Sequence, residues 1–224
     1  RLEKTFTSVN FNMMIMVIYA LITIAIFGMW YYARYEGNFL PSPKKTFNPM
    51  MLVAIVILVP GTQFAANFIA NLTGYIRPDW LQQYNELFET SGITDTTFVT
   101  VLYSVILAPI CEELIFRGVT MRCARKALPF ALANLMQAAL FGLFHLNWIQ
   151  GIYAFALGIV LGYVCERGGS IYYSMGLHLL FNLWGTLSGF FPDPGNSVVV
   201  FVIVIAVTIV SLVVGFVLFN KGRR

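Results

Sequence analysis

The segment CEELIFRG, residues 111–118, places two carboxylates and a guanidinium inside a strongly apolar stretch of chain. Glu112 and Glu113 are adjacent, and Arg117 follows Glu113 by four residues. Residues four apart share a face of a helix, so Glu113 and Arg117 can form an ion pair. Glu112 is rotated by about 100° around the helix, because one turn takes 3.6 residues. The segment therefore predicts one ion pair and a second glutamate that faces a different partner.

The only two histidines of the chain also lie in apolar segments. His145 follows Phe141 by four residues, and His178 precedes Asn182 by four, so each pair shares a helix face. A charged group in a bilayer costs at least ~2.5 kcal/mol on insertion scales, and such residues usually face a bundle interior and mark function. A single histidine is more often structural. A glutamate, two histidines and an asparagine on three separate segments predict a functional site.

The composition predicts the framework that must position these residues. The chain has 224 residues, of which 58% are hydrophobic and 11% charged. Soluble domains carry about 25% charged residues, and several apolar runs approach the ~20 residues that cross a bilayer as a helix. The runs do not alternate in polarity as transmembrane barrel strands do. We therefore expect an all-α, polytopic transmembrane helix bundle, formed as one integral membrane domain over residues 1–224.

Seven membrane spans and one interfacial helix are expected along the chain. Residues 77–92, RPDWLQQYNELFETSG, combine polar residues with apolar ones at helical spacing, as in helices that lie on a membrane surface. Pro60 and Gly61 are expected to kink the second span because proline removes a helix hydrogen bond. The spans are expected at roughly residues 12–33, 49–72, 97–122, 129–146, 150–166, 171–190 and 197–219.

Charge in the connections predicts the orientation. Lysine and arginine concentrate in cytoplasmic loops of membrane proteins, and alternate connections would put ten basic residues on one side and three on the other. The C-terminus is therefore expected in the cytoplasm and, with seven spans, the N-terminus outside. The net charge of +4 follows this pattern and does not indicate nucleic-acid binding. The compact size and short loops favour a multi-pass protein of a prokaryotic plasma membrane.

The carboxylates and histidines can converge if the third and fourth spans form a hairpin. Glu112 and His145 then lie at similar heights above the turn, since each helical residue rises 1.5 Å. His178 lies somewhat lower. We expect the three groups to meet in the cytoplasmic half of the membrane or near its middle.

Three short motifs, in order on successive segments, resemble the CPBP family. They read EELIFR at residues 112–117, FGLFH at 141–145 and HLLFN at 178–182. The family, also described as Abi-like, includes type II CAAX prenyl endopeptidases, which are intramembrane glutamic proteases, and bacteriocin-processing membrane proteins. The resemblance covers about residues 105–190 and implies a catalytic core at about residues 97–190.

The resemblance implies roles for individual residues. Glu112 matches the glutamate that activates water, and His145 matches the histidine that helps to hold that water. His178 and Asn182 match the pair that stabilises the oxyanion. The supporting residues are Glu113, Arg117 and Phe141. The implied activity is cofactor-free hydrolysis of a peptide bond in a membrane-associated or lipidated substrate, and a carboxylate in an apolar cavity is a stronger base than one in water.

Four alternatives remain open at the level of sequence. Glu112, His145 and His178 could be zinc ligands, although the chain has no HExxH motif. Cys111 could be a nucleophile, although nothing near it would lower a thiol pKa. A proton-coupled transporter would also use buried carboxylates and histidines, but no inverted repeat is apparent. A non-catalytic scaffold would bind other membrane proteins, and the intact motifs argue against it.

Overall fold

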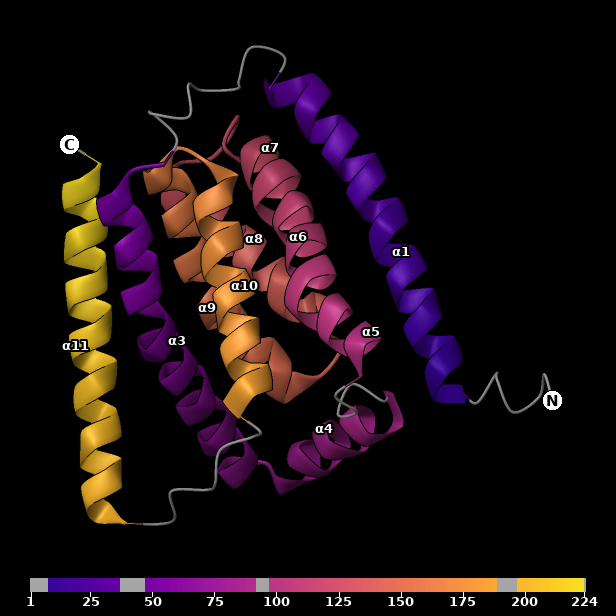
Figure 1. Cartoon of the computed structure of the whole chain (residues 1–224), viewed down its shortest axis with the longest axis vertical. Helices are drawn as coiled ribbons and strands as arrows, with labels where there is room; N and C mark the ends of the chain where they lie inside the picture. Colours follow the sequence, from indigo (N-terminus) through magenta and orange to yellow (C-terminus); the bar gives the residue numbers. More distant parts are fainter. Residues whose placement is uncertain (1–7, 37–46, 92–96, 189–196, 224) are drawn as a thin grey trace.

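The protein is a bundle of helices (Figure 1). The computed structural model describes residues 8–36, 47–91, 97–188 and 197–223, and within these ranges it contains no strand. The first helix, α1 (Ser8–Tyr31), continues into the π-helical turn η1 (Tyr32–Glu36). The other helices are α3 (Pro49–Ile76), α4 (Pro78–Ser91), α8 (Phe130–Phe144), α9 (Trp148–Gly168), α10 (Ile171–Ser188) and α11 (Val198–Gly222).

One long helix between α4 and α8 is built from five consecutive segments. They are α5 (Phe98–Val101), η2 (Leu102–Leu107), α6 (Ala108–Glu113), η3 (Leu114–Met121) and α7 (Arg122–Ala124). The two η segments are π-helical, which is a form found mostly as short insertions in α-helices and frequently at functional sites. The adjacent glutamates of the EELIFR motif lie at the end of α6, directly before the second π-helical segment.

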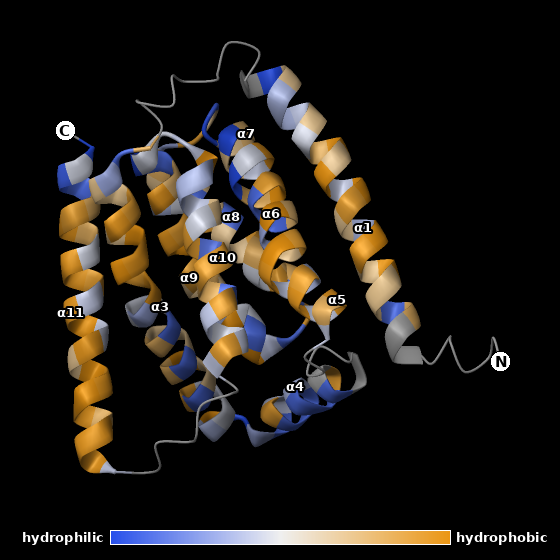
Figure 2. Ribbon diagram, viewed as in Figure 1, coloured by the Kyte–Doolittle hydropathy of each residue, from blue (hydrophilic) through white to orange (hydrophobic). Residues whose placement is uncertain are grey.

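The helical membrane bundle predicted from composition is confirmed. Among the described residues, five helices are long and apolar enough to cross a membrane, and α11 is the most uniformly hydrophobic of them (Figure 2). Helices α8 and α10 occupy two further predicted spans, but α8 has only 15 residues and α10 is not among the five. The count of seven spans therefore stays a prediction.

Helix α4 occupies the segment for which an amphipathic surface helix was predicted. It crosses one end of the bundle at a steep angle to the long helices and is largely hydrophilic (Figures 1 and 2). Two contacts hold its beginning. Arg77 donates to Asp79 at 2.9 and 2.6 Å, and the Trp80 ring stacks on Trp148 of α9 with a centroid separation of 5.4 Å. The stack joins α4 to the start of α9.

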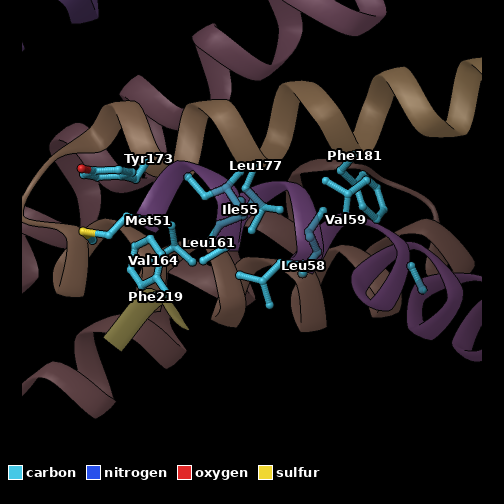
Figure 3. Close-up of a cluster of buried hydrophobic side chains, with 13 residues drawn as sticks. Met51, Ile55, Leu58, Val59, Leu161, Val164, Tyr173, Leu177, Phe181 and Phe219 are labelled. Atoms are coloured by element: carbon cyan, nitrogen blue, oxygen red, sulfur yellow. The ribbon is translucent and has the colours of Figure 1, made fainter. Parts of the chain in front are cut away.

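A buried apolar cluster holds α3, α9, α10 and α11 together (Figure 3). Gly215 of α11 allows close approach to α3, because a Cβ added there would stand 2.6 Å from the Leu58 side chain. The labelled members of the cluster are Met51, Ile55, Leu58, Val59, Leu161, Val164, Tyr173, Leu177, Phe181 and Phe219.

The hydrogen-bonding pattern of α3 is altered next to Pro60. The Gly61 N–H donates to Ser211 Oγ of α11 at 2.9 Å, and the Ser211 hydroxyl donates to the Ile57 carbonyl. In a regular helix the Gly61 N–H and the Ile57 carbonyl would pair with each other. A hydroxyl from α11 is therefore inserted into α3, at the position where proline already removes a hydrogen bond.

Candidate active site

Glu113 and Arg117 form the ion pair that their spacing predicted. Arg117 Nη1 lies 2.8 Å from Glu113 Oε1, and both side chains have 0% exposure. Arg117 also donates from Nη2 to the Gly158 carbonyl of α9 at 3.2 Å. Its guanidinium carbon lies 4.5 Å from the centre of the Phe141 ring. The arginine therefore connects its own helix to α8 and α9.

A polar network on α8 supports this pair, and sequence reasoning missed it. Gln137 Nε2 donates to the Gly158 carbonyl at 2.9 Å and to Asn134 Oδ1 at 2.7 Å. Asn134 Nδ2 donates to the Ile159 carbonyl at 3.0 Å. The close packing depends on Gly162, where an added Cβ would overlap Asn134 Oδ1. The available signal was two polar residues three positions apart in an otherwise apolar segment.

His178 lies between the two glutamates. Its Nδ1 is 2.9 Å from Glu113 Oε1, and its Nε2 is 3.5 Å from Glu112 Oε2. The ring is 3% exposed, and it meets the Phe141 ring edge-on at a centroid separation of 5.7 Å. A histidine that donates from Nδ1 to Glu113 presents Nε2 to Glu112. The buried ion pair thus orients a group that contacts the second glutamate.

His145 lies directly after the last residue of α8. The span predicted at residues 129–146 had placed it inside the helix. His145 is the C-cap residue of the helix, and Leu146 follows with a φ of 53°, in the left-handed region that reverses the chain towards α9. His145 Nδ1 is 2.8 Å from the Phe141 carbonyl oxygen. Because a carbonyl only accepts, Nδ1 carries the hydrogen, and Nε2 of the neutral ring is an acceptor.

Asn182 is held by a backbone group that a proline releases. Asn182 Nδ2 donates to the Ser104 carbonyl at 2.8 Å. In the preceding π-helical segment the Ala108 N–H donates to the Tyr103 carbonyl, five residues earlier. The same spacing would pair Ser104 with residue 109, but Pro109 has no N–H. The Ser104 carbonyl is therefore available to fix the Asn182 amide.

One cavity of about 1080 Å³ brings these residues together. Glu112, His145, His178 and Asn182 all line it, as does Phe141. Glu113 and Arg117 are fully buried, with 0% exposure. The Glu112 side chain is 15% exposed. The structure therefore divides the charges of the motif into a buried pair and one carboxylate at the cavity wall.

The cavity extends to the end of the bundle that α4 covers. Its lining includes Tyr84 of α4, Leu146 of the turn between α8 and α9, and Ser188 at the end of α10. The turn between α9 and α10, which follows Arg167, lies at the opposite end (Figure 1). The expected convergence in the cytoplasmic half of the membrane or near its middle stays a prediction, and within the bundle His145 lies towards the end that α4 covers. The helix ends three residues after Phe141, and this places the histidine on the turn.

The geometry offers no support to two of the alternative mechanisms. Among the described residues, no three His, Cys, Asp or Glu side chains form a group that could hold a metal ion. Of the alternative zinc set, Glu112 and His178 are in contact, while His145 Nδ1 is engaged with a backbone carbonyl. Cys111 is buried, and the cavity lining does not include it.

The arrangement combines a carboxylate, an acceptor nitrogen of one imidazole and the N–H groups of an amide and a second imidazole around one space. Such a set can deprotonate a water molecule and stabilise the oxyanion that forms when the water attacks a carbonyl. Residues 94–184 match the family model described as type II CAAX prenyl endopeptidase, Rce1-like. No curated protein and no solved structure matches the chain. All three motifs fall within the matched residues, and this Rce1-like match over residues 94–184 supports the resemblance of the chain to the CPBP family.

Proposed function

We propose that the protein is an intramembrane endopeptidase that hydrolyses a peptide bond of a membrane-associated or lipidated substrate. The observation that carries the proposal is the convergence of Glu112, His145, His178 and Asn182 on one cavity. The fully buried pair of Glu113 and Arg117 helps to position this set, because Glu113 contacts His178. The match of residues 94–184 to the Rce1-like family model supports intramembrane peptidase activity as the chemistry of this cavity.

In the proposed mechanism, Glu112 acts as the general base. A water molecule donates one hydrogen bond to the Glu112 carboxylate and another to Nε2 of His145, whose tautomer the Phe141 carbonyl sets. Glu112 takes a proton as the water oxygen attacks the carbonyl carbon of the substrate. Glu112 then passes this proton to the amine as the C–N bond breaks, which leaves a carboxylic acid and an amine.

The oxyanion of the tetrahedral intermediate requires donors aimed at the developing charge. The Asn182 amide has two N–H groups, and the Ser104 carbonyl uses one of them. The second N–H of Asn182 is one proposed donor. Nε2 of His178 is the other, in the ring form in which both nitrogens carry a hydrogen, since Nδ1 already donates to Glu113. Loss of one such donor costs roughly 10²–10³ in turnover.

The proposal is tested by incubating the purified protein in lipid nanodiscs with a library of hydrophobic and C-terminally prenylated peptides. Mass spectrometry should detect two products, and cleavage in H₂¹⁸O should place one ¹⁸O atom in the new carboxyl group. Wild type and Glu112→Ala are compared on the same library. Absence of cleavage by wild type, together with stable capture of another membrane protein, would favour the scaffold alternative.

We further propose that no metal ion takes part. Activity is expected to survive prolonged dialysis against a strong chelator within about twofold, because a carboxylate and not a metal ion deprotonates the water. The measurement is turnover before and after dialysis, with the zinc content of the same samples determined by elemental analysis. Stoichiometric zinc, with activity that chelation removes and added zinc restores, would instead support the set of Glu112, His145 and His178 as ligands.

A further inference from the structure

The inward face of α3 gains polar side chains beyond Val59, where Ala66 is the last α3 residue of the buried cluster. Of the labelled residues of the cluster, Val59 and Phe181 lie towards this end (Figure 3). One turn after Val59, Gln63 lines the cavity, and Asn67 follows it after a further turn. Neither residue belongs to the three motifs. The inward face of α3 therefore brings two amide side chains to the candidate active site.

Gln63 is buried with an unused acceptor. Its side chain is only 6% exposed, and its Nε2 donates to Asn67 Oδ1 at 3.2 Å. No donor in the described part of the chain reaches its Oε1. A buried acceptor without a partner destabilises a folded protein, and a leucine of similar size would avoid that cost. The arrangement is thus typical of a group kept for a ligand.

The Gln63 amide, whose Oε1 has no partner in the described part of the chain, faces α10, the helix that carries Asn182. Gly185 lies three residues after Asn182, on the same side of α10. A Cβ added at Gly185 would stand 3.9 Å from Gln63 Nε2 and 4.0 Å from Gln63 Oε1. Both Asn182 and Gly185 line the cavity. Gln63 therefore lies across a narrow space from α10, about one helical turn beyond the proposed oxyanion donor.

Two features of α3 fix this position. Asn67 holds the Gln63 amide from the following turn. In the preceding turn, the Ser211 hydroxyl of α11 is bonded into α3 between Ile57 and Gly61. The part of α3 that carries Gln63 is thus bonded to α11, so its position depends on that helix as well as on the backbone of α3.

We propose that Gln63, oriented by Asn67, is a substrate-binding residue whose Oε1 accepts a hydrogen bond from a main-chain N–H of an extended peptide next to the scissile bond. This inference rests on the proposed function and names a subsite of it. The group is neutral, so the donor it fits is a neutral N–H, which every residue except proline supplies. The small residues Ala66, Ala70 and Gly185 also line the cavity and leave room for a peptide backbone.

The test compares two identical substitutions in one cavity. Gln63→Leu removes the proposed acceptor, and Gln150→Leu is the matched control because Gln150 also lines the cavity but is not among the buried groups without a partner. Both are made in a Glu112→Gln background, so that binding is measured without turnover. The probe is a fluorescent copy of the library peptide that this background binds most tightly. Gln63→Leu should weaken its binding roughly 3–10-fold, the range of one neutral hydrogen bond, and Gln150→Leu should change it less than twofold.

A scan of the peptide backbone identifies the bond itself. Each amide of the probe is replaced in turn by an ester, which removes one N–H. At one position the ester should weaken binding to the Gln63 protein by the same 3–10-fold, and it should have no further effect on Gln63→Leu. If the loss of binding caused by the ester and the loss caused by Gln63→Leu add at every position, Gln63 does not accept a main-chain N–H, and the proposal is overturned.

Melting curves separate a binding role from a structural one. Because the substitution removes an unpaired buried acceptor, Gln63→Leu should melt at the same temperature as its parent or higher. A lower midpoint with unchanged peptide binding, or failure of both Gln63→Leu and Gln63→Met to fold, would make Gln63 structural.

Peptides that bind through Gln63 but are not cleaved by wild type would overturn the proposed hydrolysis and leave the subsite in place. A library without any binding peptide would overturn both.

Discussion

Replacement of Glu112 by alanine is expected to abolish detectable peptide hydrolysis and to leave the protein folded. Glu112 lines the cavity and is 15% exposed, and its carboxylate lies 3.5 Å from His178 Nε2. Its removal leaves the buried contacts of Glu113 with Arg117 and His178 in place. General-base catalysis contributes roughly 10²–10⁴-fold, so turnover should fall by at least this factor. His145→Ala should have a similar effect because its imidazole is proposed to hold the same water molecule.

The adjacent glutamate is the matched control. Glu112→Gln and Glu113→Gln are the same isosteric change at neighbouring positions, but only Glu113 accepts from both Arg117 and His178. We expect Glu112→Gln to be inactive with a normal melting temperature, and Glu113→Gln to melt lower. Turnover and melting are measured on the same preparations in detergent. Normal turnover of a purified, folded Glu112→Ala protein would contradict the mechanism.

The division of the two glutamates could be predicted from sequence because it depends on helix geometry. A spacing of four residues joins Glu113 to Arg117, and a rotation of about 100° turns Glu112 away, whatever the rest of the fold does. Helix α4 could also be predicted from sequence, since its apolar and polar residues repeat at helical spacing. Both features are local, and their residues lie within a few positions of one another.

Features that depend on tertiary contact were not accessible in the same way. The Ser104 carbonyl is available because Pro109 lacks an N–H, but only the packing of α10 shows that Asn182 uses it. The position of His145 depends on the left-handed backbone at Leu146, and leucine gives no signal for such a turn. Gln63 could be seen in the sequence as one polar residue in an apolar run. Its unused acceptor depends on which groups surround it in the folded bundle.

The number of spans shows a different limit. Sequence hydropathy identified a helix at each expected position, but α8 is shorter than a typical span and α10 carries His178 and Asn182. Polar residues that serve a cavity lower the mean hydropathy of the helix that presents them. This effect applies to α10, whereas the helix that carries Glu112 and Glu113 is long and apolar enough to be counted.

Arg117→Ala is expected to destabilise the protein more than any other single substitution in the motif. Arg117 has 0% exposure and contacts Glu113, the Gly158 carbonyl and the face of Phe141. Its removal leaves Glu113 as a buried carboxylate next to His178. Breaking a buried ion pair in this way costs about 3–5 kcal/mol. We expect a clear loss of thermal stability, or of yield in detergent.

Asn182→Ala provides the comparison for this effect. Asn182 is neutral and partly exposed to the cavity, where water can replace its hydrogen bond to Ser104. Its loss should therefore change melting little and slow turnover by roughly 10²–10³ if it donates to the oxyanion. Of the two variants, Arg117→Ala should have the lower melting temperature, and Asn182→Ala should have the lower turnover per folded molecule.

Arg117→Lys separates the charge of Arg117 from its geometry. Lysine keeps the positive charge but has no planar fork, so it cannot bind Glu113 and the Gly158 carbonyl in the same way while lying on the Phe141 ring. We therefore expect only partial recovery of stability relative to Arg117→Ala. If Arg117→Ala melts like wild type but is inactive, the arginine acts on the reaction itself, and the assignment of Glu113 and Arg117 to a supporting role is wrong.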